Sequence, residues 1–119
     1  MGAIDKIELY GKSYYYIDYR PMTSNEMISA VYALRDIILK ENKPFLHIAN
    51  VEGTPLSAQF TKHAGIAAKE TAHLFDKGAI IGLHGIRKIV LKGYNLSFGI
   101  KGGLKPFNTL KEAKAYILS

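Results

Sequence analysis

Two short apolar segments constrain the fold of this 119-residue chain more than any other feature. Residues 45–49 (FLHIA) and 78–83 (GAIIGL) contain no Asp, Glu, Lys or Arg, and sequence with helical periodicity flanks both. An uninterrupted apolar run of this length is typical of a strand that is buried on both faces of a parallel sheet. The pattern therefore predicts an α/β fold in which helices cover the sheet.

The first nineteen residues indicate an antiparallel hairpin. Ile4–Tyr10 and Ser13–Tyr19 are rich in aromatic and β-branched residues and flank the two-residue break Gly11-Lys12. This is the pattern of two strands that are joined by a tight turn. Four tyrosines give the second strand aromatic surface on both faces, which we interpret as packing within the sheet.

An amphipathic helix is predicted to follow the hairpin. Thr23 and Glu26 form a capping box at its start. The helix is expected to run to about Glu41 and to be closed by Asn42. Its apolar stripe comprises Met27, Val31, Leu34 and Ile38, widened by Ala30 and Ile37.

A second helix is predicted to begin near Ser57 and to stop before Gly78. Small residues at positions 64, 65, 67 and 68 are expected to let this helix approach the sheet closely. Its buried face repeats every three or four residues and comprises Phe60, Ala64, Ala67, Thr71 and Leu74.

The C-terminal third predicts a short helix, a loop, an edge strand and a last helix. The loop spans residues 95–103, and Pro106 places Leu104–Phe107 at a sheet edge because proline cannot donate to a ladder. The short helix is indicated by Ile86, Ile89, Val90 and Tyr94. A capping box of Thr109 and Glu112 opens the last helix, which is expected to bury Leu110, Ala113, Tyr116 and Ile117. The complete order is ββαβαβαβα, a mostly parallel sheet with an N-terminal antiparallel hairpin.

The composition excludes several classes of protein. The chain has no cysteine, which removes thiol catalysis, thiolate zinc sites and disulfide frameworks. Its first residues lack a signal-peptide pattern, and its apolar runs are far shorter than the ~20 residues of a membrane-spanning helix. We therefore expect a single cytoplasmic domain over residues 1–119 with no membrane span.

Charge is distributed unevenly. Residues 1–76 carry eight Lys/Arg against nine Asp/Glu, whereas residues 77–119 carry eight Lys/Arg against one, Glu112. A basic half permits an anionic partner. The basic residues form no dense run, are not interleaved with aromatics and match no nucleic-acid motif, which disfavours binding to nucleic acid.

The histidines do not form a catalytic or metal-binding pattern. His63 and His73 lie ten residues apart on one predicted helix, about 80° apart around its axis and nearly three turns distant, so they cannot share a metal. His47 lies in the middle of a buried strand and is expected to be a core side chain with satisfied hydrogen bonds. His84 has no evident partner for a triad, and no phosphate-binding glycine motif is present. We expect no enzymatic activity, no metal and no cofactor.

The turn after the first apolar strand is the strongest candidate for a functional surface. Glu52 and Gly53 lie in this turn, and the hydroxyls of Thr54 and Ser57 lie at or near the start of the next helix. Helix N-termini favour anions, so a phosphate on either hydroxyl would be stabilised there. N-capping alone also explains Ser57.

The order of elements and several segments resemble the SpoIIAA-like family, which is grouped with the STAS domains. The segments are the hairpin and the stretches 18–27 (DYRPMTSNEM), 48–54 (IANVEGT), 78–82 (GAIIG) and 105–113 (KPFNTLKEA). The resemblance implies a non-enzymatic regulatory or protein-interaction module, similar to anti-sigma-factor antagonists. In those proteins a phosphorylatable Ser or Thr follows the central strand within an Asp-Ser-Ser-Gly-like sequence. This chain has Val51-Glu52-Gly53-Thr54-Pro55-Leu56-Ser57 there, which puts Thr54 or Ser57 near the equivalent position.

An alternative hypothesis is a small apolar or anionic ligand. The SpoIIAA-like family also resembles the lipid-carrying CRAL-TRIO (Sec14) fold, which implies an apolar ligand. The predicted site lies between residues 84–92 and the loop 95–103, with His84, Arg87, Lys88 and Phe98 as candidate contacts. The identity of any protein partner and the presence of a homodimer are left open by the sequence.

Overall fold

The computed structural model describes residues 4–85, 91 and 103–119. Its core is a five-stranded sheet with the order β1-β2-β3-β4-β5. The strands are β1 (Ile4–Leu9), β2 (Lys12–Asp18), β3 (Phe45–Asn50), β4 (Phe75–Ile81) and β5 (Leu104–Phe107). The helices are α1 (Ser24–Glu41), α2 (Ala58–Thr71) and α4 (Leu110–Ile117), and a 3₁₀ turn, η1 (Ala72–Leu74), follows α2.

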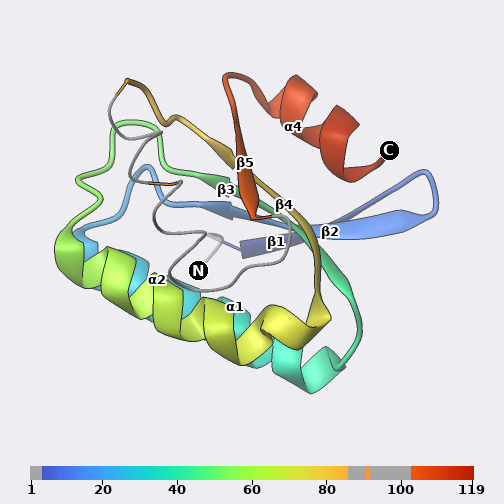
Figure 1. Cartoon of the computed structure of the whole chain (residues 1–119), viewed down its shortest axis with the longest axis horizontal. Coiled ribbons are helices and arrows are strands. Elements are labelled where there is room, and N and C mark those ends of the chain that lie inside the picture. The colour runs from blue at the N-terminus through green and yellow to red at the C-terminus, as the bar shows by residue number, and fades with distance from the viewer. Residues whose placement is uncertain (1–3, 86–90, 92–102) are drawn as a thin grey trace.

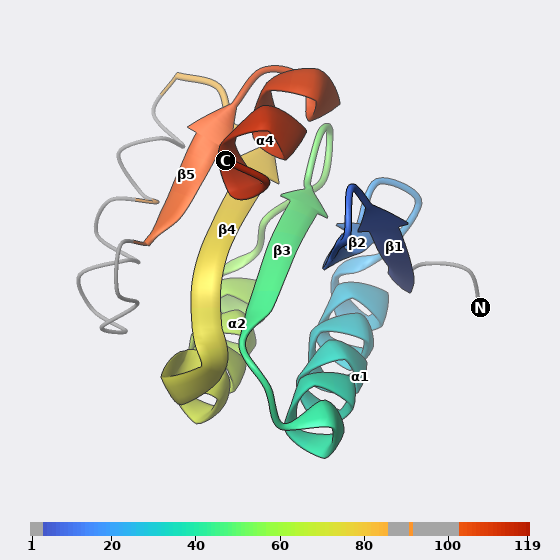
Figure 2. The ribbon, with the colours of Figure 1, turned by 90° about the vertical axis from the view of Figure 1, so that its right-hand side faces the viewer.

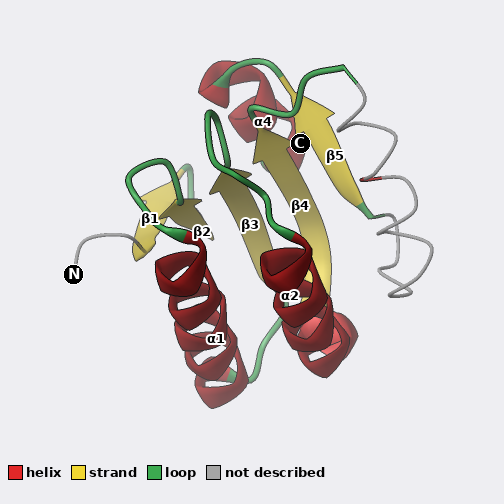
Figure 3. Ribbon diagram, turned by 90° about the vertical axis from the view of Figure 1, so that its left-hand side faces the viewer, coloured by secondary structure: helices red, strands yellow, loops and turns green. Residues whose placement is uncertain are grey.

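Helices cover both faces of this sheet. α1 and α2 lie side by side on one face, and α4 lies on the opposite face (Figures 1, 2 and 3). β1 and β2 pair in antiparallel fashion, and all the other neighbouring strands pair in parallel. The predicted α/β class, the N-terminal hairpin and the edge position of the last strand are confirmed.

The hairpin turn differs from the prediction by one residue. Leu9 pairs with Lys12, so the two turn residues are Tyr10 and Gly11 rather than Gly11 and Lys12. Both have positive φ, 53° and 78°. Two successive residues with positive φ match the twist of a two-residue hairpin, which explains why the turn requires this backbone.

The central strands are buried on both faces, as the apolar runs predicted. Along β3, Phe45 and Ala49 belong to the core beneath α1 and α2, whereas Leu46 and Ile48 belong to the core beneath α4. The tyrosines of β2 divide in the same way, because Tyr15 packs in the first core and Tyr14 in the second. The sheet thus separates two apolar cores.

α1 follows its prediction closely, with one exception. Thr23 and Glu26 form the reciprocal capping box, and Asn42 caps the C-terminus in the left-handed conformation. Met27, Ala30, Leu34 and Ile38 are buried, but Ile37 is 39% exposed.

β4 begins three residues earlier than predicted. α2 ends at Thr71, and β4 starts at Phe75 rather than at Gly78. The ring of Phe75 packs edge-on against Phe45 of β3, with 5.7 Å between the ring centroids. Asp76 is exposed, so the first residues of this strand lack the apolar character that marks its buried part.

The last helix buries fewer side chains than predicted. Ala113 and Ile117 are buried, but Leu110 is 37% exposed because it lies at the first helical position. Thr109 caps the helix, and its hydroxyl donates to the carboxylate of Glu112 instead of forming the predicted full capping box.

The predicted helix 86–94 and loop 95–103 lie outside the described residues, apart from Leu91 and Gly103. Both of these residues are buried. Among the residues that the structure describes, no helix is long and apolar enough to cross a membrane.

Candidate functional site

A cavity of about 240 Å³ lies between the sheet and the layer formed by α1 and α2. Its wall is mostly apolar. α1 contributes Leu34 and Ile38, α2 contributes Phe60 and Ala67, and the sheet contributes Phe45 and Ile80.

Small residues on α2 help to explain the cavity. Ala64, Ala67 and Ala68 all line it. The sequence suggested that these residues would let α2 approach the sheet closely, but the structure leaves space beneath them instead. A short side chain at three positions of one helix face fills little of the volume between helix and sheet. The prediction of close approach was therefore wrong.

Among the described residues of the cavity wall, His47 is the one polar side chain with a buried atom that lacks a hydrogen-bond partner. Its Nε2 is buried and has no hydrogen-bond partner among the described residues. The remainder of the ring is partly accessible and lines the cavity. Burial lowers the pKa of His47 from 6.5 to about 4, so the imidazole is neutral at pH 7. His47 is a core residue, as predicted, but the prediction that its hydrogen bonds are satisfied was wrong.

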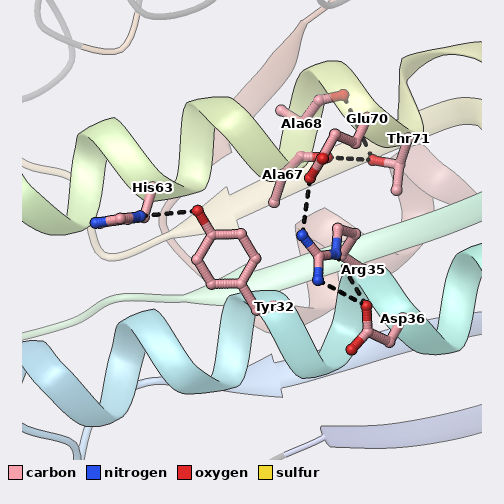
Figure 4. Close-up of polar contacts among 8 residues, drawn as sticks. All are labelled: Tyr32, Arg35, Asp36, His63, Ala67, Ala68, Glu70 and Thr71. Atoms are coloured by element: carbon pink, nitrogen blue, oxygen red, sulfur yellow. Dashed lines mark hydrogen bonds and ion pairs between the residues drawn. The ribbon is translucent and has the colours of Figure 1, made fainter.

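Polar contacts bridge α1 and α2 at the outer side of the helix layer (Figure 4). The hydroxyl of Tyr32 lies 2.8 Å from Nδ1 of His63. The guanidinium of Arg35 binds Glu70 across the two helices at 3.0 Å and Asp36 on its own helix at 2.9 Å. Arg35 also lines the cavity, and its charge is engaged by two carboxylates.

The turn after β3 and the turn after β4 meet at one edge of the sheet. The carboxylate of Glu52 lies 3.0 Å from Nε2 of His84, and both side chains are exposed. Gly82 makes this approach possible, because a Cβ at that position would lie 2.5 Å from the backbone of Glu52. The sequence assigned Glu52 and His84 to two separate candidate sites, whereas the structure brings them together.

The two candidate hydroxyls differ in their environments. Thr54 is only 3% exposed, and its hydroxyl donates to the carbonyl of Val51 at 2.8 Å. Ser57 is half-buried and caps α2 by accepting a hydrogen bond from the N–H of Phe60 at 3.1 Å. Its hydroxyl also lies 2.5 Å from the hydroxyl of Ser24, the first residue of α1.

Backbone interactions stabilise the turn at residues 51–54. Gly53 has a φ of 71°, and the N–H of Thr54 donates to the carbonyl of Val51 at 3.1 Å. A positive φ favours glycine, so Gly53 has a conformational role. It is exposed at the surface.

Sequence reasoning missed the role of Asn50, the last residue of β3. Its side chain is buried, accepts the N–H of Glu52 at 3.1 Å and donates to the hydroxyl of Tyr16 at 3.1 Å. It thereby fixes the start of the turn that presents Glu52. Asparagine directly before a Gly-containing turn is a known signal for such a side-chain turn.

Three of the four predicted ligand contacts are not among the described residues. Arg87, Lys88 and Phe98 lie outside the described residues. Within the described part of the chain, no group of three or more His, Cys, Asp or Glu side chains could hold a metal ion.

Comparisons with known proteins support the fold and leave the function open. The sequence matches no family model and no curated protein. One solved structure is similar: an uncharacterized protein from the DUF3478 family with a SpoIIAA-like fold, from Shewanella loihica PV-4. It superposes with a TM-score of 0.72 and 15% sequence identity, over 97% of this chain and 92% of the other. This chain has a SpoIIAA-like fold.

Proposed function

We propose that this protein is a non-enzymatic binding module that holds a small apolar ligand in the cavity between its helix layer and its sheet. The observation that carries the proposal is the cavity itself, about 240 Å³ with a mostly apolar wall. An apolar cavity of about 150 Å³ accepts benzene in a well-studied case. By proportion, this cavity has room for roughly ten carbon atoms.

In this proposal, the ligand enters the cavity from solvent beside Pro55 and Leu56. Pro55 and Leu56 line it, and Pro55 is exposed at the surface. Both residues follow the turn that carries Glu52 and Gly53, so the entrance would lie beside the sheet edge where the turns after β3 and β4 meet. Entry at this edge also agrees with the usual position of ligand sites in open α/β folds.

A cavity-filling substitution tests this proposal. Naphthalene has ten carbon atoms, and its binding can be followed by calorimetry or by NMR titration of the folded protein. Ala67→Leu adds three carbon atoms at a residue that is 4% exposed and lines the cavity. We expect it to abolish naphthalene binding and to stabilise the fold by about 1–2 kcal/mol, because the added groups fill existing space.

The matched control lies on the other side of the sheet. Ala115 is exposed on α4, which packs against the opposite core. Ala115→Leu adds the same atoms without reaching the cavity, so naphthalene should bind this variant as it binds the wild type. Unchanged binding to Ala67→Leu, or no binding to the wild type, would contradict the proposal.

A second candidate function is recognition of a protein partner by the turn at residues 52–57. The observation in its favour is an exposed Glu52–His84 pair on a backbone that Asn50 and Gly82 hold in place. Rigid exposed turns with charged groups suit recognition. A switch at Ser57 would act by breaking its contacts with Ser24 and with the N–H of Phe60.

A charge substitution at Ser57 tests this candidate. Ser57→Asp keeps an oxygen that can cap α2 but adds a charge beside Ser24, whereas Ser57→Ala removes the hydroxyl without adding charge. If residue 57 is a switch, the two variants should differ in affinity for a purified partner. Equal affinity for the wild type and both variants would exclude it.

A further inference from the structure

We propose that a second, more open groove, on the α4 side of the sheet, binds a small phosphate monoester through the lysines of its wall. The groove has a volume of about 320 Å³ and lies at the N-terminal ends of β2, β3 and β4, beside the end of α4. Its wall includes Lys12, Lys43 and Lys77. The site is separate from the apolar cavity, so this inference goes beyond the proposed function and does not depend on it.

The strand register brings these three lysines together although they are far apart in the sequence. β3 pairs in parallel with β2 and with β4, so the starts of the three strands lie at one edge of the sheet. Lys77 lies beside Leu46 in the β3–β4 ladder, and Leu46 belongs to the core beneath α4. Lys12 lies on the same face of β2 as Tyr14, which packs in that core too. Lys12 and Lys77 therefore both lie on the α4 side.

The end of α4 positions two of the ammonium groups. Nζ of Lys12 donates to the carbonyl of Leu118 at 3.4 Å. Nζ of Lys77 donates to the main-chain and hydroxyl oxygens of Ser119 at 3.0 and 3.1 Å. Cations at this end of a helix complement its dipole, so both lysines also have a structural role. An ammonium group has three donors, so each lysine keeps at least one donor for a ligand.

The described acidic side chains do not pair with the lysines of the groove. No Asp or Glu of the described residues forms an ion pair with Lys12, Lys43 or Lys77. Glu41 binds Lys6 at 2.8 Å. The hydrogen bond from Lys6 is the main cause of the lowered pKa of Glu41, and the charge of Lys43 adds to it through space. The ammonium groups of the wall are therefore available to an external anion.

The net charge of the groove favours an anion. Asp76 is the one acidic side chain among the described residues of the wall, so three lysines against one carboxylate leave a charge of +2. A terminal carboxylate on Ser119 would reduce this charge to +1. Positive charges that converge in a concave site raise the local concentration of anions.

A phosphate monoester suits this groove better than a carboxylate. Its phosphate group has a charge of about −1.5 to −2 at pH 7 and three strong acceptor oxygens, so it can contact several ammonium groups at once. A carboxylate has one charge on two oxygens. Small-molecule sites have volumes of roughly 300–1,000 Å³, so the groove also has room for a compact organic group on the phosphate.

Phenyl phosphate and benzoate test the site and its preference, because both carry the same ring. We expect phenyl phosphate to bind the folded protein at pH 7 with a Kd of about 1 mM. In NMR titrations it should shift the amide signals of residues 12–13, 43–46 and 76–77. Benzoate should bind about two- to fivefold more weakly, the range that one exposed ion pair supplies.

Substitutions that remove one charge each assign the binding to the groove. Lys12→Gln and Lys43→Gln change exposed residues and should each weaken phenyl phosphate binding by about two- to fivefold. The double variant should lose roughly the product of the two factors. Lys62→Gln is the matched control, because Lys62 is exposed on α2, on the other side of the sheet, and its loss should leave the Kd unchanged.

Vesicles that contain phosphatidic acid present the same phosphate group on a membrane surface. Binding of phenyl phosphate that weakens in both groove variants and persists in Lys62→Gln supports the inference. The inference is overturned if phenyl phosphate does not bind, if Lys62→Gln loses as much affinity as the groove variants, or if benzoate binds equally well. Binding to the vesicles alone would also overturn it, since a membrane would then be the partner. None of these outcomes affects the binding of naphthalene in the apolar cavity, so the proposed function is tested separately.

Discussion

At the scale of a single residue, the buried imidazole of His47 makes stability depend on pH. Its pKa falls from 6.5 to about 4 on folding, so the unfolded state binds the proton more tightly. The contribution of His47 to the free energy of unfolding is fully present above pH 6.5 and is lost as pH falls from 6.5 toward 4. We expect the free energy of unfolding to drop by about 2 kcal/mol between pH 7 and pH 5, measured by urea denaturation.

His47→Leu is the control for this prediction, because it removes the titrating group and should remove most of the drop. The paired carboxylates act in a different range. A hydrogen bond from Arg20 lowers the pKa of Asp18, and one from Lys6 lowers the pKa of Glu41. The contributions of these two carboxylates to stability are lost only at a pH below their ordinary pKa values, which are near 4. Equal pH dependence of the wild type and His47→Leu between pH 7 and pH 5 would refute the prediction.

Residue roles were predictable from the sequence where the signal is local. Thr23, Asn42 and Ser57 cap helices as predicted, because a cap depends on a few neighbouring backbone groups. The orphaned Nε2 of His47 was not predictable. It depends on which side chains enclose that atom, whereas the accessible part of the ring faces the cavity that three alanines of α2 leave.

At the scale of the elements, Gly82 sets the spacing between the turns after β3 and β4. Its φ is 98°, and a Cβ there would lie 2.5 Å from the backbone N and Cα of Glu52. Gly82→Ala therefore combines an unfavourable backbone conformation with a clash against main-chain atoms. We expect it to lower the free energy of unfolding by about 2–4 kcal/mol and to separate Glu52 from His84, measured by denaturation and by the NMR signals of His84.

Gly11→Ala provides the matched comparison for this prediction. Gly11 also has a positive φ, 78°, but a Cβ there would meet no atom within 4 Å. This variant has the conformational cost alone, about 1–2 kcal/mol. Equal losses of stability in the two variants would show that the contact with Glu52 is unimportant.

The elements themselves were largely predictable, and their neighbours in space were not. The apolar runs identified β3 and β4 because burial on both faces leaves a continuous signal. The sequence placed Glu52 and His84 after separate strands, but it did not state that those strands are adjacent. Since β3 and β4 pair in parallel, their C-terminal ends meet at one edge, and the two predicted sites become one surface.

At the scale of the whole molecule, fold and cavity depend on different properties of the sequence. The fold is shared with a protein of 15% identity over 97% of the chain, so it does not require most of the particular residues of this chain. The cavity depends on particular side chains, such as Ala64 and Ala67 on α2 and His47 on β3. The proposed ligand chemistry therefore belongs to this chain and is not transferred from the structural relative.

The division of the molecule into two cores predicts how ligand binding will change its dynamics. The cavity belongs to the core beneath α1 and α2, whereas α4 packs on the opposite face with Ala113 and Ile117. Naphthalene in the cavity should stabilise α1, α2 and the strands between them against local opening. Amides of α4 that exchange by fraying of this short helix should be unaffected, because local openings have independent free energies.

Hydrogen exchange followed by NMR can resolve these two responses. With naphthalene, we expect slower exchange for amides of α1 and α2 and unchanged exchange for α4. Ala67→Leu should show no response in any element, because the space that remains is too small for the ten carbon atoms of naphthalene. Equal protection of α4 and α2 in the wild type would have one of two causes. Either every measured amide exchanges through global unfolding, or the ligand binds outside the cavity. Repeating the titration with Ala67→Leu separates these two causes. A response that persists in Ala67→Leu would place the ligand outside the cavity.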